Sequence, residues 1–395
     1  MCSAPADTVR PVTAVNLDHA ATTPLRPEAL EAMLPFLRDG VGNPSGSHSL
    51  ARAATRALDE ARESLAETLC VSPPDVVITS GGTEADNLAL AGAHLALREA
   101  GVSEPVVLGT AVEHPAVRET VRSLGGTLCP VDGDGVVDLD ALERLVEEAA
   151  GRLAVVSVML VNNETGVVEP VPEAASLVHG LEESALVHCD AVQGFVWCDV
   201  GREAEGADVL SLSAHKFGGP QGVGALVARE AARRRLRPIQ RGGPQERQLR
   251  AGTQNVAGAV GMAVAARLTV SERAAARRRV DALGDRLLAG LLELGDVEPA
   301  VARHRRVGAI CNVRIRGLLA EELLLVLDAR GLYASAGSAC ASGALEPSPV
   351  LAAMGVDHRA AREHVRFSLG YETTGDDVER ALAIVGDAVS SLRGP

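Results

Sequence analysis

Lys216 is the one lysine in a chain of 395 residues, in which lysine and arginine together number 38. Lysine has an ε-amine that can lose its proton and condense with a carbonyl, whereas arginine stays protonated. A chance surface lysine is the alternative interpretation. The apolar run 209–212 before it and the Phe-Gly-Gly-Pro sequence after it are not a setting that a surface lysine needs. We therefore predict that Lys216 forms a Schiff base.

A second chemical signal lies in residues 80–85 (SGGTEA), between a predicted strand at 76–79 and a predicted helix at 83–100. Exposed backbone N–H groups at such a turn, together with the positive end of a helix, form a site for phosphate. The turn has neither the Gly-Lys-Ser/Thr of a Walker loop nor the spacing of a dinucleotide motif. It could also serve only to cap the helix. A single phosphate motif suits a monophosphate cofactor.

Asp190 follows a predicted strand at 185–189. A carboxylate at the carboxyl end of a strand points into the crevice where open α/β sheets bind ligands, although it could instead cap a helix. Pyridoxal phosphate needs an amine for its aldehyde, an acid for its ring nitrogen and donors for its phosphate. Lys216, Asp190 and the turn at 80–85 together predict this cofactor.

The rest of the chain alternates short apolar runs with longer helical patterns, which predicts an α/β fold with a mainly parallel sheet. Further strands are expected at 106–108, 153–161 and 209–212, and one at 222–228 where the sheet ends. The mass of 40.8 kDa indicates two domains. We expect them at 16–257 and 258–395, with residues 1–15 packing on the second. Long helices are expected at 257–294 and 376–392, and a mobile loop at 333–347.

Composition excludes several classes of function. A net charge of −14 argues against a nucleic-acid partner. The chain shows neither a signal-peptide pattern nor an apolar run long enough to span a membrane, so we expect a cytoplasmic protein. Its seven cysteines form no CxxC pair and no zinc-type cluster, which predicts no metal site and free thiols in a reducing compartment.

The motifs resemble, in order and over nearly the whole chain, those of the cysteine desulfurases (NifS/IscS-like), in the class V aminotransferase group of fold-type-I pyridoxal-phosphate enzymes. The resemblance runs from residues 17–24 (LDHAATTP) to 366–370 (RFSLG). It implies a large domain with a mainly parallel sheet and a smaller α/β C-terminal domain. In such enzymes Lys216 would hold the cofactor, Asp190 would pair with the ring nitrogen and Gln193 would meet the ring hydroxyl.

The same resemblance implies roles for residues that are weak signals alone. His114 would stack on the ring, and Asn163 would lie near the ring and the substrate carboxylate. Arg366 would clamp that carboxylate with help from Asn43. The implied phosphate contacts are Gly82, Thr83, Ser213, His215 and Thr253. In the family the last of these reaches across from a second subunit, which implies a homodimer.

Cys340 separates a desulfurase from transaminase relatives. A lone cysteine among small residues is usually a buried spacer, but a Ser/Ala/Gly loop is also suited to exposing a thiol. The family places its persulfide-forming nucleophile here. L-cysteine would displace Lys216, whose amine then removes the Cα proton. The Cys340 thiolate would attack the substrate sulfur and leave alanine, with His114 exchanging the proton of the thiol.

Four residues depart from the usual family pattern: Pro244, Ala251, Ala336 and Ala341. Pro244 and Ala251 lie close in sequence to Thr253, so the geometry of its implied phosphate contact is not predicted. Selenocysteine lyase, or another β-lyase that uses the same cofactor, is the alternative enzyme, and a catalytically silent scaffold for sulfur carriers is the alternative of another class. The sulfur acceptor, for iron-sulfur clusters, tRNA thiolation or another thio-cofactor, is not predicted.

Overall fold

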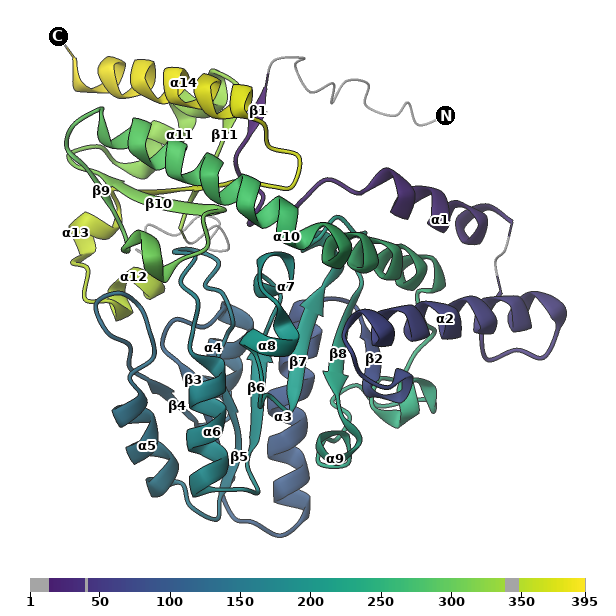
Figure 1. Cartoon of the computed structure of the whole chain (residues 1–395). Helices are drawn as coiled ribbons and strands as arrows, with labels where there is room; N and C mark the ends of the chain where they lie inside the picture. The colour runs from purple at the N-terminus through teal and green to yellow at the C-terminus, as the bar shows by residue number, and fades with distance from the viewer. Residues whose placement is uncertain (1–13, 40–41, 338–347, 395) are drawn as a thin grey trace, which may run out of the picture.

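The computed structural model describes residues 14–39, 42–337 and 348–394, and within them a seven-stranded sheet forms the centre (Figure 1). Its strand order is β2-β8-β7-β6-β5-β3-β4. All the strands run parallel except β8, which is antiparallel to both of its neighbours. In sheet order the strands are Val76–Thr79, Gly224–Ala228, Val209–Ser213, Leu186–Asp190, Leu153–Ser157, Val106–Thr110 and Thr127–Cys129.

Helices cover both faces of this sheet, so its strands are apolar on both sides. Val155 on β5 packs with α3 and α4, whereas its neighbour Val156 packs on the opposite face in a cluster that includes α5, α6 and α10 (Val256–Leu292). The bounds are Gly82–Glu99 for α3, Pro115–Ser123 for α4, Leu139–Glu148 for α5 and Val171–Leu181 for α6. Short helices are α7 (Gly194–Trp197), α8 (Val200–Glu203) and α9 (Glu230–Arg233).

A second, antiparallel sheet has the order β12-β13-β10-β9 and lies beside the amino-terminal strand (Figure 1). Its strands are Ser335–Ala336, His364–Ser368, Ile310–Ile315 and Val297–Pro299. The short strand β1 (Val15–Asn16) pairs in parallel with β11 (Leu332–Tyr333). The helices here are α11 (Ala320–Ala329), α12 (Pro349–Ala353), α13 (His358–Ala361) and α14 (Gly375–Arg393).

The long helix α10 (Val256–Leu292) connects the two sheets (Figure 1). Glycines let it approach its neighbours closely. A Cβ at Gly261 would lie 2.6 Å from the sulfur of Met33 in α1 (Pro27–Arg38), and one at Gly284 would lie 2.0 Å from the carbonyl oxygen of Gly308. Its first half also packs on α2 (Ser49–Thr68). The proposed domain boundary at 257 falls at the start of this helix and stays a prediction.

The α/β fold with a mainly parallel sheet is confirmed. Two details of the sequence-based expectation are wrong. The strand expected at 222–228 does not end the sheet, because β8 pairs with β7 on one side and with β2 on the other. The strand expected at 153–161 ends at Ser157, although the N–H groups of Val158 and Leu160 still bond to β6. Within the described ranges, no helix combines the length and apolar character that spanning a membrane requires.

Candidate active site

The residues predicted to surround the cofactor lie at or after the ends of strands that meet at the same edge of the large sheet. β2, β3, β5, β6 and β7 are parallel to one another, so their carboxyl ends meet there. Asp190, the last residue of β6, is in register with Ser211 on β7, two residues before Ser213. Such an edge is where open α/β sheets bind ligands.

Lys216 ends a short 3-10 turn, Ala214–Lys216, directly after β7. Its Nζ donates hydrogen bonds to the carbonyl oxygens of Ala20 (2.6 Å) and Ala21 (2.9 Å). A small cavity beside it is also lined by Gln193 and Gly370. The unique lysine is therefore half-buried between the amino-terminal segment and the sheet edge, beside a small cavity.

The turn at 80–85 has glycines at two positions that would not readily accept a side chain. Gly81 has a φ of 155°, which side chains rarely adopt, and a Cβ at Gly82 would lie 2.7 Å from Cγ2 of Val192. α3 then begins at Gly82, and the first N–H groups of a helix have no partner within it. Thr83, next in the turn, is exposed. Ser213 approaches this turn, with its Oγ 3.7 Å from the position that a Cβ of Gly81 would take.

His215 lies one residue before the lysine and is partly buried. Its Nδ1 is 3.1 Å from Oγ1 of Thr22. Burial, and then the charge of Lys216, lower its pKa to about 4. His215 is therefore neutral at physiological pH and would bind a phosphate through an N–H group.

Asp190 is buried at the end of β6, and its Oδ1 accepts a hydrogen bond from the N–H of Val192 at 2.9 Å. The helix after it begins at Gly194 with Gln193 as its cap, so Asp190 does not cap that helix. Burial raises the pKa of Asp190, and the charges of His114 and Lys216 oppose that increase. His114 and Lys216 are thus near enough for their charges to act on Asp190.

Below Asp190 lies a cluster of buried polar residues that the sequence analysis did not identify. His188 is held between the Oγ atoms of Ser157 and Ser211, at 2.9 Å each, and burial lowers its pKa to about 3. Burial, and then the charge of Asp190, raise the pKa of both Asp86 and Glu113. These residues could have been noticed in the sequence, because they are polar residues within otherwise apolar strand and helix patterns.

His114 is the N-cap of α4. Its Nδ1 accepts a hydrogen bond from the N–H of Ala116 at 3.2 Å. Burial lowers its pKa, with Asp190 acting in the opposite direction. The ring is therefore held as a neutral imidazole with its proton on Nε2, where it can stack on a cofactor or exchange a proton.

Arg366 lies on β13 of the second sheet, and its side chain is buried. Nη2 donates to Oδ1 of Asp18 at 2.7 Å, and Nη1 donates to the carbonyl oxygen of Asn163 at 2.9 Å. Asp18 is two residues before Ala20, which contacts Lys216. Within the described ranges, the buried Nε of Arg366 and Oε1 of Gln193 have no hydrogen-bond partner. Both atoms are thus available to a bound molecule.

Cys340 lies outside the described residues. The residues on either side of its segment both contact Glu164, the neighbour of Asn163. Ser348 donates to Oε2 of Glu164 at 2.5 Å, and a Cβ at Gly337 would lie 2.6 Å from the same oxygen. The described residues that flank the segment with Cys340 therefore lie beside Glu164, next to Asn163. The loop expected at 333–347 includes a short strand, Ser335–Ala336, before the part that is not described.

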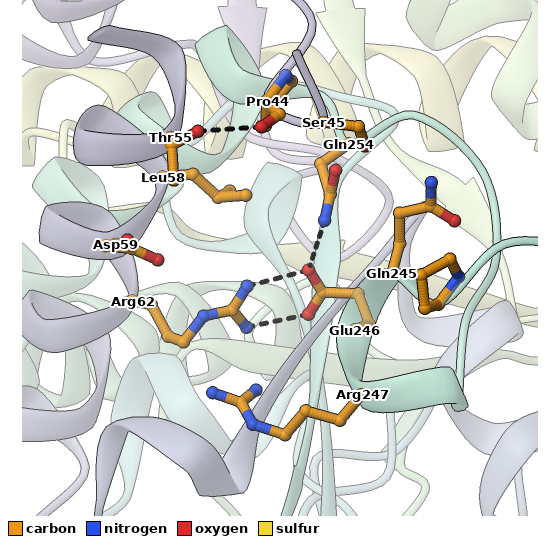
Figure 2. Close-up of a pocket in the computed structure, with 11 residues that line it drawn as sticks. Pro44, Ser45, Thr55, Leu58, Asp59, Arg62, Gln245, Glu246, Arg247 and Gln254 are labelled. Carbon is orange, nitrogen blue, oxygen red and sulfur yellow. Dashed lines mark hydrogen bonds and ion pairs between the residues drawn. The ribbon is translucent and has the colours of Figure 1, made fainter. Parts of the chain in front are cut away.

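Asn43 and Thr253 are exposed. Asn43 accepts a hydrogen bond from the N–H of Ser45. Its neighbour Pro44 and Thr253's neighbour Gln254 line the same surface hollow (Figure 2). Neither residue forms a hydrogen bond with Arg366, whose partners within the described ranges are Asp18 and Asn163. Their roles in binding stay predictions.

The backbone beside Thr253 is strained. Glu246, Arg247 and Gln248 have φ values of 45°, 56° and 67°. A left-handed conformation costs roughly 1–2 kcal/mol for each residue that is not glycine. Arg62 of α2 forms an ion pair with Glu246, in which both side chains are buried, and both distances are 2.7 Å (Figure 2). The sequence analysis did not single out this pair.

Residues 15–381 match the family described as aminotransferase class-V. The chain belongs to the class-V aminotransferase family. Among family members, it is 41% identical to an IscS-like cysteine desulfurase of Mycobacterium tuberculosis, with 95% of this chain and 96% of the relative covered. It is 38% identical to a cysteine desulfurase IscS of Methanosarcina thermophila, with 96% and 93% covered.

A solved NifS-like protein has the same fold, with a TM-score of 0.87 and 34% identity over 96% of this chain and all of that one. The predicted resemblance to the cysteine desulfurases of this family is therefore confirmed. The residues that the family motifs identify fall into two groups. Those expected around the cofactor ring lie at one sheet edge, whereas Asn43 and Thr253 lie on the exposed surface.

Proposed function

We propose that this protein is a pyridoxal-phosphate-dependent cysteine desulfurase, which removes sulfur from L-cysteine and releases L-alanine. The observation that carries this proposal is that the only lysine lies just after β7, the strand that pairs with β6, whose last residue is Asp190. The similarity to cysteine desulfurases over 95% of the chain supports it.

The described residues fit pyridoxal phosphate group by group. Lys216 supplies the amine, Asp190 an acid for the ring nitrogen, and Gln193 a buried oxygen that lacks a partner within the described ranges. Gly82, Thr83, Ser213 and His215 would hold the phosphate, and Thr253 of a second subunit would complete this set. When bound, the cofactor withdraws electrons from the substrate Cα.

Lys216 would hold and move a proton. Its Nζ is held by the carbonyl oxygens of Ala20 and Ala21 in this structure and would be released from them to act as a base toward the substrate Cα. The amine must lose its own proton to do so.

Arg366 and Asn163 would orient the substrate. The guanidinium is already fixed by Asp18 and by the carbonyl oxygen of Asn163, which leaves Nε and further N–H groups for a substrate carboxylate. A charge-assisted contact of this kind sets the position of the amino acid relative to Lys216.

Cys340 would accept the sulfur. Its thiolate attacks the sulfur of the substrate, so that a sulfur–sulfur bond forms as the carbon–sulfur bond breaks. The three-carbon product takes up protons and leaves as alanine. A free thiol has a pKa of about 8.5, so a base must assist, and the neutral His114 is suited to this task. Support for the location comes from Gly337 and Ser348, which both contact Glu164 beside Asn163.

The proposed enzyme acts as a homodimer in the cytoplasm and passes the persulfide to an acceptor protein. The exposure of Thr253 and Asn43 supports a shared site. The five described cysteines outside the proposed nucleophile segment are free, four of them buried and Cys70 exposed. This accords with the reducing compartment that the sequence predicts.

One experiment tests the reaction. Purified protein is loaded with pyridoxal phosphate, and alanine release is measured with L-cysteine and with L-selenocysteine. Alanine from cysteine, with sulfide after addition of a reductant, is expected. Strong preference for selenocysteine would favour a selenocysteine lyase instead, and a protein that takes up no pyridoxal phosphate would contradict the whole proposal.

A further inference from the structure

The carboxylate of Glu246 is the buried anchor of the surface segment that carries Thr253. Oε2 accepts hydrogen bonds from Nη1 of Arg62 (2.7 Å) and from the N–H of Ile78 in β2 (2.9 Å). Oε1 accepts from Nη2 of Arg62 (2.7 Å) and from Nε2 of Gln254 (3.2 Å). Figure 2 shows Arg62 and Gln254 converging on this side chain. All the bonding positions of the carboxylate are therefore used.

This anchor holds a backbone that would otherwise relax. Three successive residues, Glu246 to Gln248, have positive φ values, and none of them is glycine. Such a conformation persists only where surrounding contacts over-determine it. Arg62 supplies those contacts, since it pairs with Glu246 and also donates to the carbonyl oxygen of Val76 at 2.5 Å. The strained turn is thus fixed to the edge strand β2, which leads into the turn at 80–85.

Hydrogen bonds on both sides of Thr253 connect it to the strained turn. Gln254, the next residue, donates to Glu246, and Gly252, the residue before, donates its N–H to Oε1 of Gln245 at 3.1 Å. Arg250 adds a second attachment, because its Nε bonds to Oε1 of Glu84 at 2.8 Å. Glu84 in turn accepts the N–H of Ser80 in the predicted phosphate turn. The flanks of Thr253 are therefore held while Thr253 itself is exposed.

We propose that Arg62 and Glu246 are positioning residues for the cofactor phosphate of the partner subunit. They set the strained turn that presents Thr253 outward, at a place where a second copy of the chain can receive it. This inference rests on the proposed function, from which the contact of Thr253 across the subunit boundary is taken. The new element is that a buried ion pair in one subunit determines the affinity of the other subunit for pyridoxal phosphate.

Glu246→Gln tests the role of the pair, because it removes the charge and keeps the side-chain shape. The apo dimer is titrated with pyridoxal phosphate, and the visible absorbance of the lysine-bound cofactor gives the dissociation constant. We expect binding to weaken roughly tenfold or more, the size of a lost hydrogen bond to a charged group. The matched control is Glu363→Gln, which breaks another arginine–carboxylate pair beside the second sheet; there Glu363 is buried and its partner Arg314 is 27% exposed. The control should retain the affinity of the parent protein.

Glu246→Gln leaves Arg62 buried and unpaired, and the variant could fail to fold. The double variant Arg62→Met/Glu246→Gln removes both charges, a change that proteins often tolerate. Sedimentation velocity confirms that it is a folded dimer. Its affinity for pyridoxal phosphate should stay reduced, because nothing then fixes the strained turn. A double variant with parental affinity would overturn the inference.

A mixed dimer distinguishes action across the boundary from action within one chain. One subunit carries Lys216→Ala and the other Glu246→Gln, so the single remaining lysine faces an intact Thr253 segment from its partner. We expect this lysine to bind pyridoxal phosphate with parental affinity. Weak binding in the mixed dimer would refute the cross-subunit role. Failure of the unmodified protein to take up pyridoxal phosphate would instead refute the proposed function itself.

Discussion

Nη2 of Arg366 lies 2.7 Å from Oδ1 of Asp18, and the two residues are separated by 348 positions in the chain. The guanidinium is buried, whereas the side chain of Asp18 is 27% exposed. This ion pair joins the second sheet to the amino-terminal segment whose carbonyl oxygens hold Lys216. Arg366, the proposed substrate clamp, and Lys216, the proposed cofactor lysine, are thereby both oriented by one short segment.

Arg366→Lys should raise the KM for L-cysteine by roughly 10- to 100-fold, because lysine cannot form the planar fork that holds a carboxylate. Cofactor absorbance should be unchanged, since Arg366 is not expected to contact the cofactor. Steady-state kinetics of alanine release measure the effect. Arg314→Lys, on the neighbouring strand β10, is the control and should leave KM unchanged. A fall in kcat with an unaltered KM would contradict the assigned role.

Borohydride reduction of the loaded protein should attach the cofactor to a single peptide, because the chain contains one lysine. Digestion and mass spectrometry identify the site. Lys216→Arg keeps the positive charge but cannot form the bond, so it should lose both the label and turnover. Residual alanine release from Lys216→Arg at the parental rate would show that the charge alone suffices.

Cys340→Ala should retain cofactor absorbance and lose persulfide formation, which is measured by trapping with an alkylating reagent and by alanine release from cysteine. The expected loss exceeds about 100-fold, because no other thiol is expected to reach the substrate sulfur. Cys70→Ala is the matched control, since Cys70 is an exposed free thiol. If Cys70→Ala lost activity and Cys340→Ala did not, the nucleophile would be wrongly assigned.

Gly82→Ala should weaken pyridoxal phosphate binding by about tenfold or more, because a Cβ there would lie 2.7 Å from Cγ2 of Val192 and push the phosphate turn outward. Titration of the apo protein by absorbance measures the change. Gly180→Ala in α6 is the control, as no heavy atom lies within 4 Å of its Cβ position. That substitution should raise stability by about 0.5–1 kcal/mol and leave binding intact. Equal affinity of the two variants for pyridoxal phosphate would contradict the predicted steric clash at Gly82.

Glu169→Gln should change how stability depends on pH. Burial raises the pKa of Glu169 from 4.5 to about 8, despite a hydrogen bond from the N–H of Val137. Above pH 4.5 the unfolded chain releases this proton and the folded protein retains it, so stability is full below that pH and is lost as the pH rises toward 8. Between pH 5 and pH 8 this loss is roughly 3–4 kcal/mol.

Glutamine does not titrate, so denaturant unfolding of Glu169→Gln should show a smaller loss of stability over this pH range. The exposed Glu173→Gln in α6 provides the comparison and should follow the parent protein. Parallel pH curves for the parent and Glu169→Gln would mean that Glu169 is ionised in the folded state.

Local sequence determined much of this protein. The apolar runs and glycine-rich turns predicted the parallel sheet, because strand periodicity and turn chemistry depend on neighbouring residues. Lys216, Asp190 and the turn at 80–85 each follow a strand directly, so a short stretch of sequence sufficed to suggest a shared edge. The predicted cofactor class followed from these three features together.

The tertiary structure decided which distant residues pair. It inserted β8 between β2 and β7, joined Arg366 to Asp18, and joined Glu246 to Arg62 across 184 positions. It also buried His188, Asp86 and Glu113 beneath Asp190 and left Thr253 exposed. These outcomes depend on which surfaces are removed from water when the elements pack. Burial determines both the pKa of a carboxyl group and the strength of an ion pair, and no local pattern in the sequence specifies it.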